Sequence, residues 1–125
     1  MNSTDLPGIF QQLRSLLARY QPPLVSKHDM WRYFDLWSFK DLVIEGRKRK
    51  EVFFAGLIIQ KGYVGFYFMP VYSDVEMKEF FQPELLSRLK GKSCFHIKKL
   101  DEVLLGQIDA ALQAGYALYQ QKGWI

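Results

Sequence analysis

The feature that most constrains the fold is a pair of long apolar segments joined by two residues. Residues 51–60 read EVFFAGLIIQ, which is apolar on both faces of an extended strand and typical of a central position in a sheet. Lys61 and Gly62 follow, and glycine readily takes the positive φ of a tight hairpin turn. Residues 63–72 return as an aromatic-rich segment, with Pro70 near the end of its predicted hydrogen-bond ladder. The sequence therefore predicts a central β-hairpin.

Two amphipathic helices flank this hairpin. The first is predicted over about residues 5–20, capped by Thr4 or Asp5 and stopped by Pro22 and Pro23. Its apolar stripe is Ile9, Phe10, Leu13, Leu16, Leu17 and Tyr20. The last helix is predicted between an Asp101 cap and Gly123. Its stripe is Leu104, Ile108, Ala111, Leu112, Gly115, Leu118 and Tyr119. Because each helix has one apolar stripe, both should cover the same face of a sheet.

The remaining segments are shorter. Extended segments are expected at 24–29, 33–38, 42–45 and 93–98, and a helical turn at 74–81. A short helix should begin at Pro83 and be closed by Gly91. The strands are nearly contiguous in the chain, which favours antiparallel pairing. The predicted fold is a single two-layer α+β domain, with a mainly antiparallel sheet of about five strands covered on one face by the N- and C-terminal helices.

The composition narrows the class of protein. A chain of 125 residues, 49% hydrophobic, can bury a core without a metal or disulfide. No apolar run approaches 18 residues, and the first residues lack the pattern of a signal peptide. Cys94 is the only cysteine, which excludes an internal disulfide and fits a reducing compartment. These features predict a cytoplasmic protein that does not enter a membrane.

Catalytic and metal-binding patterns are weak. Cys94 and His96 are the one tempting nucleophile and base, but residues i and i+2 of a strand are too far apart for a direct hydrogen bond. His28 and Asp29 are distant in sequence from that pair, and the acids Asp74, Glu76, Glu79 and Glu84 straddle a turn and a helix start. The sequence therefore predicts no enzyme, no cofactor and no metal site.

Aromatic residues are the unusual feature. The chain has 20, of which fourteen fall between Trp31 and Phe81. Aromatic side chains should occupy both faces of the strand at 63–72, so the face away from the helices stays aromatic. That face is predicted to carry a ligand cleft formed by Trp37, Tyr63, Tyr67 and Met69. The alternative is a thicker core, with the segment at 74–81 lying over this face.

Basic residues offer a second binding surface. The net charge is +4, and the one dense basic run is Arg47, Lys48, Arg49 and Lys50. We interpret this run as a basic loop that faces anions, with an ordinary solvated turn as the alternative. Aromatic residues beside basic ones also suit stacking on nucleobases. Nucleic acid is nevertheless disfavoured as a partner, because neighbouring apolar residues indicate that the aromatics are buried.

The last helix suggests an assembly. Its face opposite the core stripe carries small and uncharged residues, namely Gly106, Ala110, Gln113 and Ala117. Small residues let a second helix approach closely, so the sequence predicts a weak homodimer through this face. Alanine used only as a helix former is the alternative.

A series of motifs resembles the YdhG-like bacterial family. They are Phe53-Phe54-Ala55-Gly56, the run from Tyr63 to Tyr72, Pro83-Glu84-Leu85-Leu86, Gly91-Lys92-Ser93-Cys94-Phe95 and the spacing Gly115…Tyr119…Gly123. The resemblance covers about residues 24–125 and implies a small cytoplasmic α+β domain of unknown function, with no agreed reaction or cofactor. One branch is proposed to chaperone iron as frataxin does, with an acidic helix and edge strand, whereas the first helix here has Asp5 as its only acid.

Three functions stay open from the sequence. The leading prediction is a non-enzymatic module that binds a small molecule or a protein. The alternatives are frataxin-like iron handling and nucleic-acid binding.

Overall fold

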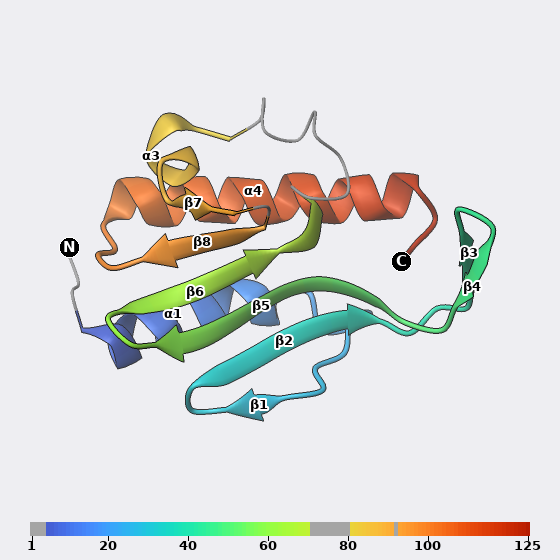
Figure 1. Ribbon diagram of the computed structural model, residues 1–125, viewed down its shortest axis with the longest axis horizontal. Helices are drawn as coiled ribbons and strands as arrows, with labels where there is room; N and C mark the ends of the chain where they lie inside the picture. The colour runs from blue at the N-terminus through green and yellow to red at the C-terminus, as the bar shows by residue number, and fades with distance from the viewer. Residues whose placement is uncertain (1–4, 71–80, 92) are drawn as a thin grey trace.

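The protein folds into two layers (Figure 1). The computed structural model describes residues 5–70, 81–91 and 93–125. One layer is a six-stranded antiparallel sheet in the order β1-β2-β5-β6-β8-β7. Its strands are β1 (Asp29–Met30), β2 (Tyr33–Ser38), β5 (Val52–Gln60), β6 (Tyr63–Phe68), β7 (Leu89–Lys90) and β8 (Cys94–Ile97). The helices α1 (Leu6–Ala18) and α4 (Glu102–Gln121) form the other layer and pass behind the strands in Figure 1. The predicted α+β class is confirmed, with six strands in the main sheet rather than about five.

The central hairpin forms as predicted. Gln60 pairs with Tyr63 around the turn at Lys61 and Gly62, and Gly62 has a φ of 89°. The predicted end at residue 72 is wrong, because β6 stops at Phe68 and Met69 and Pro70 are helical. Proline has no N–H to donate to a strand ladder, so the sheet cannot continue through Pro70. Residues 71 and 72, like the predicted turn up to residue 80, lie outside the described residues.

Both long helices follow their predicted caps and stripes. The Asp5 carboxylate accepts a hydrogen bond from the Gly8 amide at 3.1 Å, and Asp101 accepts one from Leu104 at 2.8 Å. The α1 stripe is buried from Ile9 to Leu17, as is most of the α4 stripe. Arg19 and Asp109 form an ion pair at 3.4 Å between the two helices. The core therefore lies between this helical layer and one face of the sheet.

Two local predictions need correction. The helix α3 (Pro83–Leu86) begins at proline as expected but ends at Leu86. Gly91, with a φ of 77°, instead forms the turn between β7 and β8. The predicted basic loop is also wrong, because β4 (Arg47–Arg49) pairs with β3 (Leu42–Ile44) in a separate two-stranded ribbon. Glu45 and Gly46 both have positive φ, which is the geometry of a two-residue hairpin turn.

A β-bulge between β2 and β5 changes which side chains reach each face. Leu36 pairs with Ala55, but Trp37 pairs with Phe53, so Phe54 has no partner opposite it. The Phe54 ring is fully buried and lies 5.3 Å from the ring of Tyr119 on α4. Tyr119 donates a hydrogen bond to the Phe53 carbonyl at 2.7 Å, and burial raises the pKa of this phenol, which keeps the donor protonated. The bulge thus sends Phe54 into the core and Phe53 to the opposite face.

Within the described ranges, no helix is both long and apolar enough to span a lipid bilayer.

Candidate functional site

The candidate site lies on the face of the sheet away from α1 and α4. Alternation along the strands places one set of side chains on this face, and the strand pairing aligns them in two rows. One row is Tyr33, Ile58, Gly65 and His96, and the next is Asp35, Gly56, Tyr67 and Cys94. We call this surface the open face, because the described helices leave it uncovered (Figure 1).

A cleft of about 400 Å³ lies on the open face. It is lined by Tyr33, Trp37, Phe53, Gly56, Ile58, Tyr67, Met69 and Ser93. Its volume falls within the range of small-molecule sites, and its lining is mostly aromatic and aliphatic. Three of the four predicted cleft residues, Trp37, Tyr67 and Met69, therefore come together. Tyr63 lies outside the lining, and its ring stacks on His96 with centroids 3.8 Å apart.

Two glycines let aromatic rings lie close to the sheet. A Cβ atom at Gly56 would come within 3.1 Å of the Phe53 ring, and one at Gly65 within 3.0 Å of the Tyr67 ring. Real Cβ atoms rarely approach neighbours so closely, so these rings occupy the space that side chains would fill. The absence of side chains at Gly56 and Gly65 therefore shapes the floor of the cleft and its surroundings.

Aromatic contacts hold the walls in place. Trp37 and Phe53 pack edge to face with centroids 5.1 Å apart. The Lys27 ammonium lies 3.9 Å from the Trp37 ring centroid and also forms an ion pair with Glu51. Rings fixed by such contacts lose little entropy when a ligand binds, which favours affinity.

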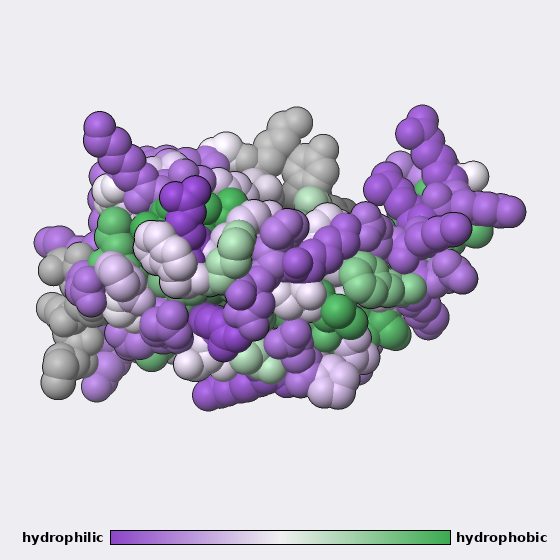
Figure 2. Space-filling view, turned by 90° about the horizontal axis from the view of Figure 1, so that it is seen from below, coloured by the Kyte–Doolittle hydropathy of each residue, from purple (hydrophilic) through white to green (hydrophobic). Residues whose placement is uncertain are grey.

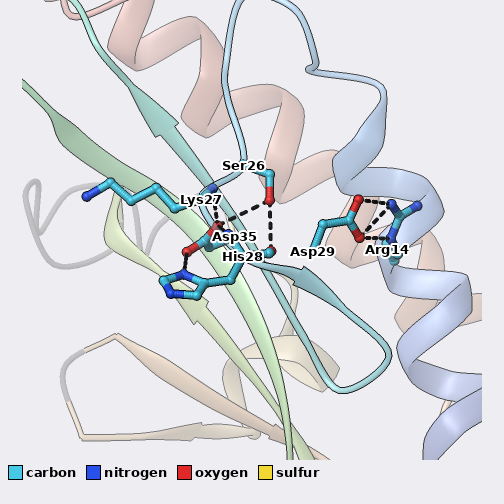
Figure 3. Close-up of polar contacts among 6 residues, drawn as sticks. All are labelled: Arg14, Ser26, Lys27, His28, Asp29 and Asp35. Atoms are coloured by element: carbon cyan, nitrogen blue, oxygen red, sulfur yellow. Dashed lines mark hydrogen bonds and ion pairs between the residues drawn. The ribbon is translucent and has the colours of Figure 1, made fainter.

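A buried carboxylate organises the segment beside Tyr33 (Figure 3). Asp35 is 1% exposed, and its Oδ1 accepts hydrogen bonds from the amides of Lys27 and His28, both at 2.8 Å. Its Oδ2 lies 2.7 Å from Nδ1 of His28, whose ring stacks on Tyr33 with centroids 4.5 Å apart. Burial raises the pKa of Asp35, but the hydrogen bonds from His28 and Lys27 outweigh it, so the net pKa is below the ordinary value. Asp35 thus fixes the residues that support one wall of the cleft.

A second ion pair anchors the outer edge of the sheet. Arg14 on α1 contacts both carboxylate oxygens of Asp29 on β1, at 2.7 and 2.8 Å (Figure 3). The Arg14 guanidinium also lies 4.6 Å from the Phe34 ring centroid. This bidentate geometry holds β1 against the helical layer.

Cys94 and His96 share the open face, as alternation predicts. Burial raises the pKa of the Cys94 thiol, and a hydrogen bond with Tyr67 only partly offsets this effect. The thiolate that a nucleophile needs is therefore disfavoured. The His96 ring is engaged in its stack with Tyr63. No cluster of three or more His, Cys, Asp or Glu residues suited to a metal ion occurs in the part of the chain that the structure describes.

The remaining predicted surfaces are exposed. Arg47, Lys48 and Arg49 form strand β4 of the ribbon, which projects from one end of the molecule as a hydrophilic arm (Figure 2). Lys50 follows it and is also exposed. On α4, the residues Gly106, Ala110, Gln113 and Ala117 are all exposed. The homodimer through that face stays a prediction.

That prediction has a direct test. Ala110→Glu places like charges near the two-fold axis and should shift the protein to monomer while the far-ultraviolet circular dichroism stays unchanged. Light scattering at high protein concentration gives the outcome. A wild type that is monomeric throughout contradicts the dimer and leaves helix propensity as the reason for the small residues.

Sequence reasoning missed several lining residues. Tyr33 could have been predicted, because it lies four residues before Trp37 on the same expected strand and alternation puts both on one face. Phe53 could not have been predicted, because its position on this face depends on the β-bulge between β2 and β5. Asp35 was also missed, although a lone acid between Phe34 and Leu36 in an apolar strand indicates a buried, satisfied carboxylate.

Comparisons of this chain with protein-family models, with curated proteins and with solved structures found no match.

Proposed function

We propose that the protein is a non-enzymatic binding module whose open-face cleft takes a small molecule with a flat ring system. The observation that carries this proposal is the 400 Å³ cleft with aromatic walls contributed by neighbouring strands. Tyr33, Phe53 and Tyr67 present ring surface that suits stacking against a planar ligand.

The chemistry around the cleft supports binding rather than catalysis. The Asp35 carboxylate is committed to backbone amides and to His28, so it is not free to act as a general base. The neighbouring thiol has a raised pKa. Membership of the YdhG-like family and a cytoplasmic location remain proposals from the sequence. Both are compatible with a binding role.

The proposal is tested with Nile red, a neutral planar dye whose fluorescence rises in apolar surroundings. Tyr67→Ala removes an aromatic wall of the cleft, and Tyr63→Ala is its matched control, because the Tyr63 ring lies outside the lining and stacks on His96. Losing about 60 Å² of apolar contact costs about 1.5 kcal/mol. We therefore expect Tyr67→Ala to weaken dye binding at least tenfold.

The two variants must first give the same circular dichroism spectrum as the wild type. Equal dye affinity in all three proteins, or no saturable binding to the wild type, contradicts the proposed function.

A further inference from the structure

A second, larger depression adjoins the cleft. It has a volume of about 1310 Å³ and shares Trp37, Phe53 and Met69 with the cleft lining. Its outer wall is the ribbon, which contributes Ile44, Lys48 and Arg49. The surface of the protein therefore runs without a break from the aromatic rings of the cleft to the ribbon.

Positively charged side chains predominate in the lining of this depression. Lys48, Arg49, Lys50 and Lys122 all line it, and none of them forms an ion pair with another described residue. Two acids also line it, but Glu51 is neutralised by Lys27. Four cations thus face one unpaired carboxylate, that of Glu45. Neighbouring like charges repel one another, so the arrangement favours the arrival of an anion.

The two surfaces have complementary requirements. The cleft suits a flat ring system, whereas the ribbon suits a multiply charged anion, for which lysine and arginine are the usual partners. Because Trp37, Phe53 and Met69 belong to both surfaces, the aromatic cleft and the basic ribbon form one continuous surface.

We infer that the ligand is a planar aromatic molecule carrying a phosphate group, of the mononucleotide class. Its ring lies in the cleft and its phosphate contacts Lys48, Arg49 and Lys50. This inference rests on the proposed function, because it takes the cleft as the seat of the ring.

The test compares adenosine 5′-monophosphate with adenosine, which has the same ring and no phosphate. Binding is followed by calorimetry with the full chain. Hydrogen bonds to charged groups are among the stronger contacts in proteins, so we expect the nucleotide to bind at least about tenfold more tightly than the nucleoside. Raising the salt concentration should weaken the binding of the nucleotide and leave the affinity for adenosine unchanged.

The variant Lys48→Gln/Arg49→Gln/Lys50→Gln should remove this advantage. The matched control is Lys61→Gln/Lys98→Gln/Lys99→Gln, which removes the same number of charges from exposed positions outside the depression. It should retain the preference for the nucleotide.

Each other outcome overturns the inference in a distinguishable way. Equal affinity for the two compounds, or Nile red binding without nucleotide binding, overturns the phosphate contact and leaves the proposed cleft function standing. Loss of nucleotide binding in both charge variants shows that only net charge matters, which also overturns it. If a deoxythymidine oligonucleotide binds a hundredfold more tightly than the mononucleotide, the ligand is a nucleic-acid strand rather than a small molecule, and the inference is overturned. Failure of all probes, including the dye, overturns both proposals.

Discussion

Asp35→Ala is expected to lower the free energy of unfolding by about 3 kcal/mol. The change leaves the amides of Lys27 and His28 without their acceptor in a site where Asp35 itself is 1% exposed. An unsatisfied buried donor costs about 1–3 kcal/mol, and two donors are affected. Urea unfolding at pH 7 measures the effect. Asp35→Asn keeps an acceptor oxygen and should cost about 1 kcal/mol, whereas an equal loss in both variants contradicts this account of the network.

The same carboxylate makes stability depend on pH. Because the pKa of Asp35 is lower in the folded protein, its contribution is fully present above the unfolded value of about 3.9. The contribution is lost as the pH falls through the folded pKa. The stability difference between wild type and Asp35→Asn should therefore be constant above about pH 5 and shrink below about pH 4. A difference that stays constant down to pH 2 contradicts the lowered pKa.

Gly115→Ala is expected to destabilise the protein by about 2 kcal/mol, although alanine is the better helix former. A Cβ atom at this position would lie 2.5 Å from the tip of the Phe68 ring and 2.9 Å from the Pro70 ring. Phe68 cannot move aside easily, because Phe54, Phe66 and Phe81 surround its ring with centroids 5.3 to 6.0 Å away. Overpacking a filled core costs about 1–3 kcal/mol, occasionally more, which exceeds the gain in helix propensity.

Gly106→Ala is the matched control on the same helix. Nothing lies within 4 Å of a Cβ atom at Gly106, and the position is exposed. Only the helix propensity then changes, so this variant should gain up to about 1 kcal/mol. Thermal unfolding of both variants gives the comparison. Stabilisation by both substitutions would show that α4 does not pack as closely on the sheet as Gly115 implies.

The sequence predicted those parts of the fold that local chemistry decides. The hairpin at Lys61 and Gly62, the Asp5 and Asp101 caps and both helical stripes depend on neighbours within one or two turns of chain. Gly91 was misplaced because a glycine with positive φ serves a helix end and a hairpin turn equally well. The extended segment predicted at 42–45 is present as β3, but its pairing with β4 was missed, since that pairing depends on a turn at Glu45 and Gly46 that composition alone does not reveal.

The cleft was predicted in part, and strand register explains the limit. Tyr67 and Met69 were placed on one face by alternation, which is a local property, and Trp37 was named beside them. Tyr63 was included by the same rule. It is the first residue of β6 and pairs with Gln60 at the turn, so its ring stacks on His96 and lies outside the cleft. Phe53 required knowledge of a bulge that forms only when β2 pairs with β5.

The most direct test of the open-face cleft is an amide chemical-shift titration of the ¹⁵N-labelled protein with an uncharged planar probe such as adenosine. Gly56 lines the cleft, and Gly106 lies on the exposed face of α4 on the other layer. Glycine amides resonate in a sparsely populated region, so both can be followed. We predict that the Gly56 amide shifts in a saturable manner, whereas Gly106 does not move and Tyr67→Ala reduces the change. Shifts centred on Gly106, or none at Gly56 at saturating probe, would contradict the claim that the open face of the sheet holds the ligand site.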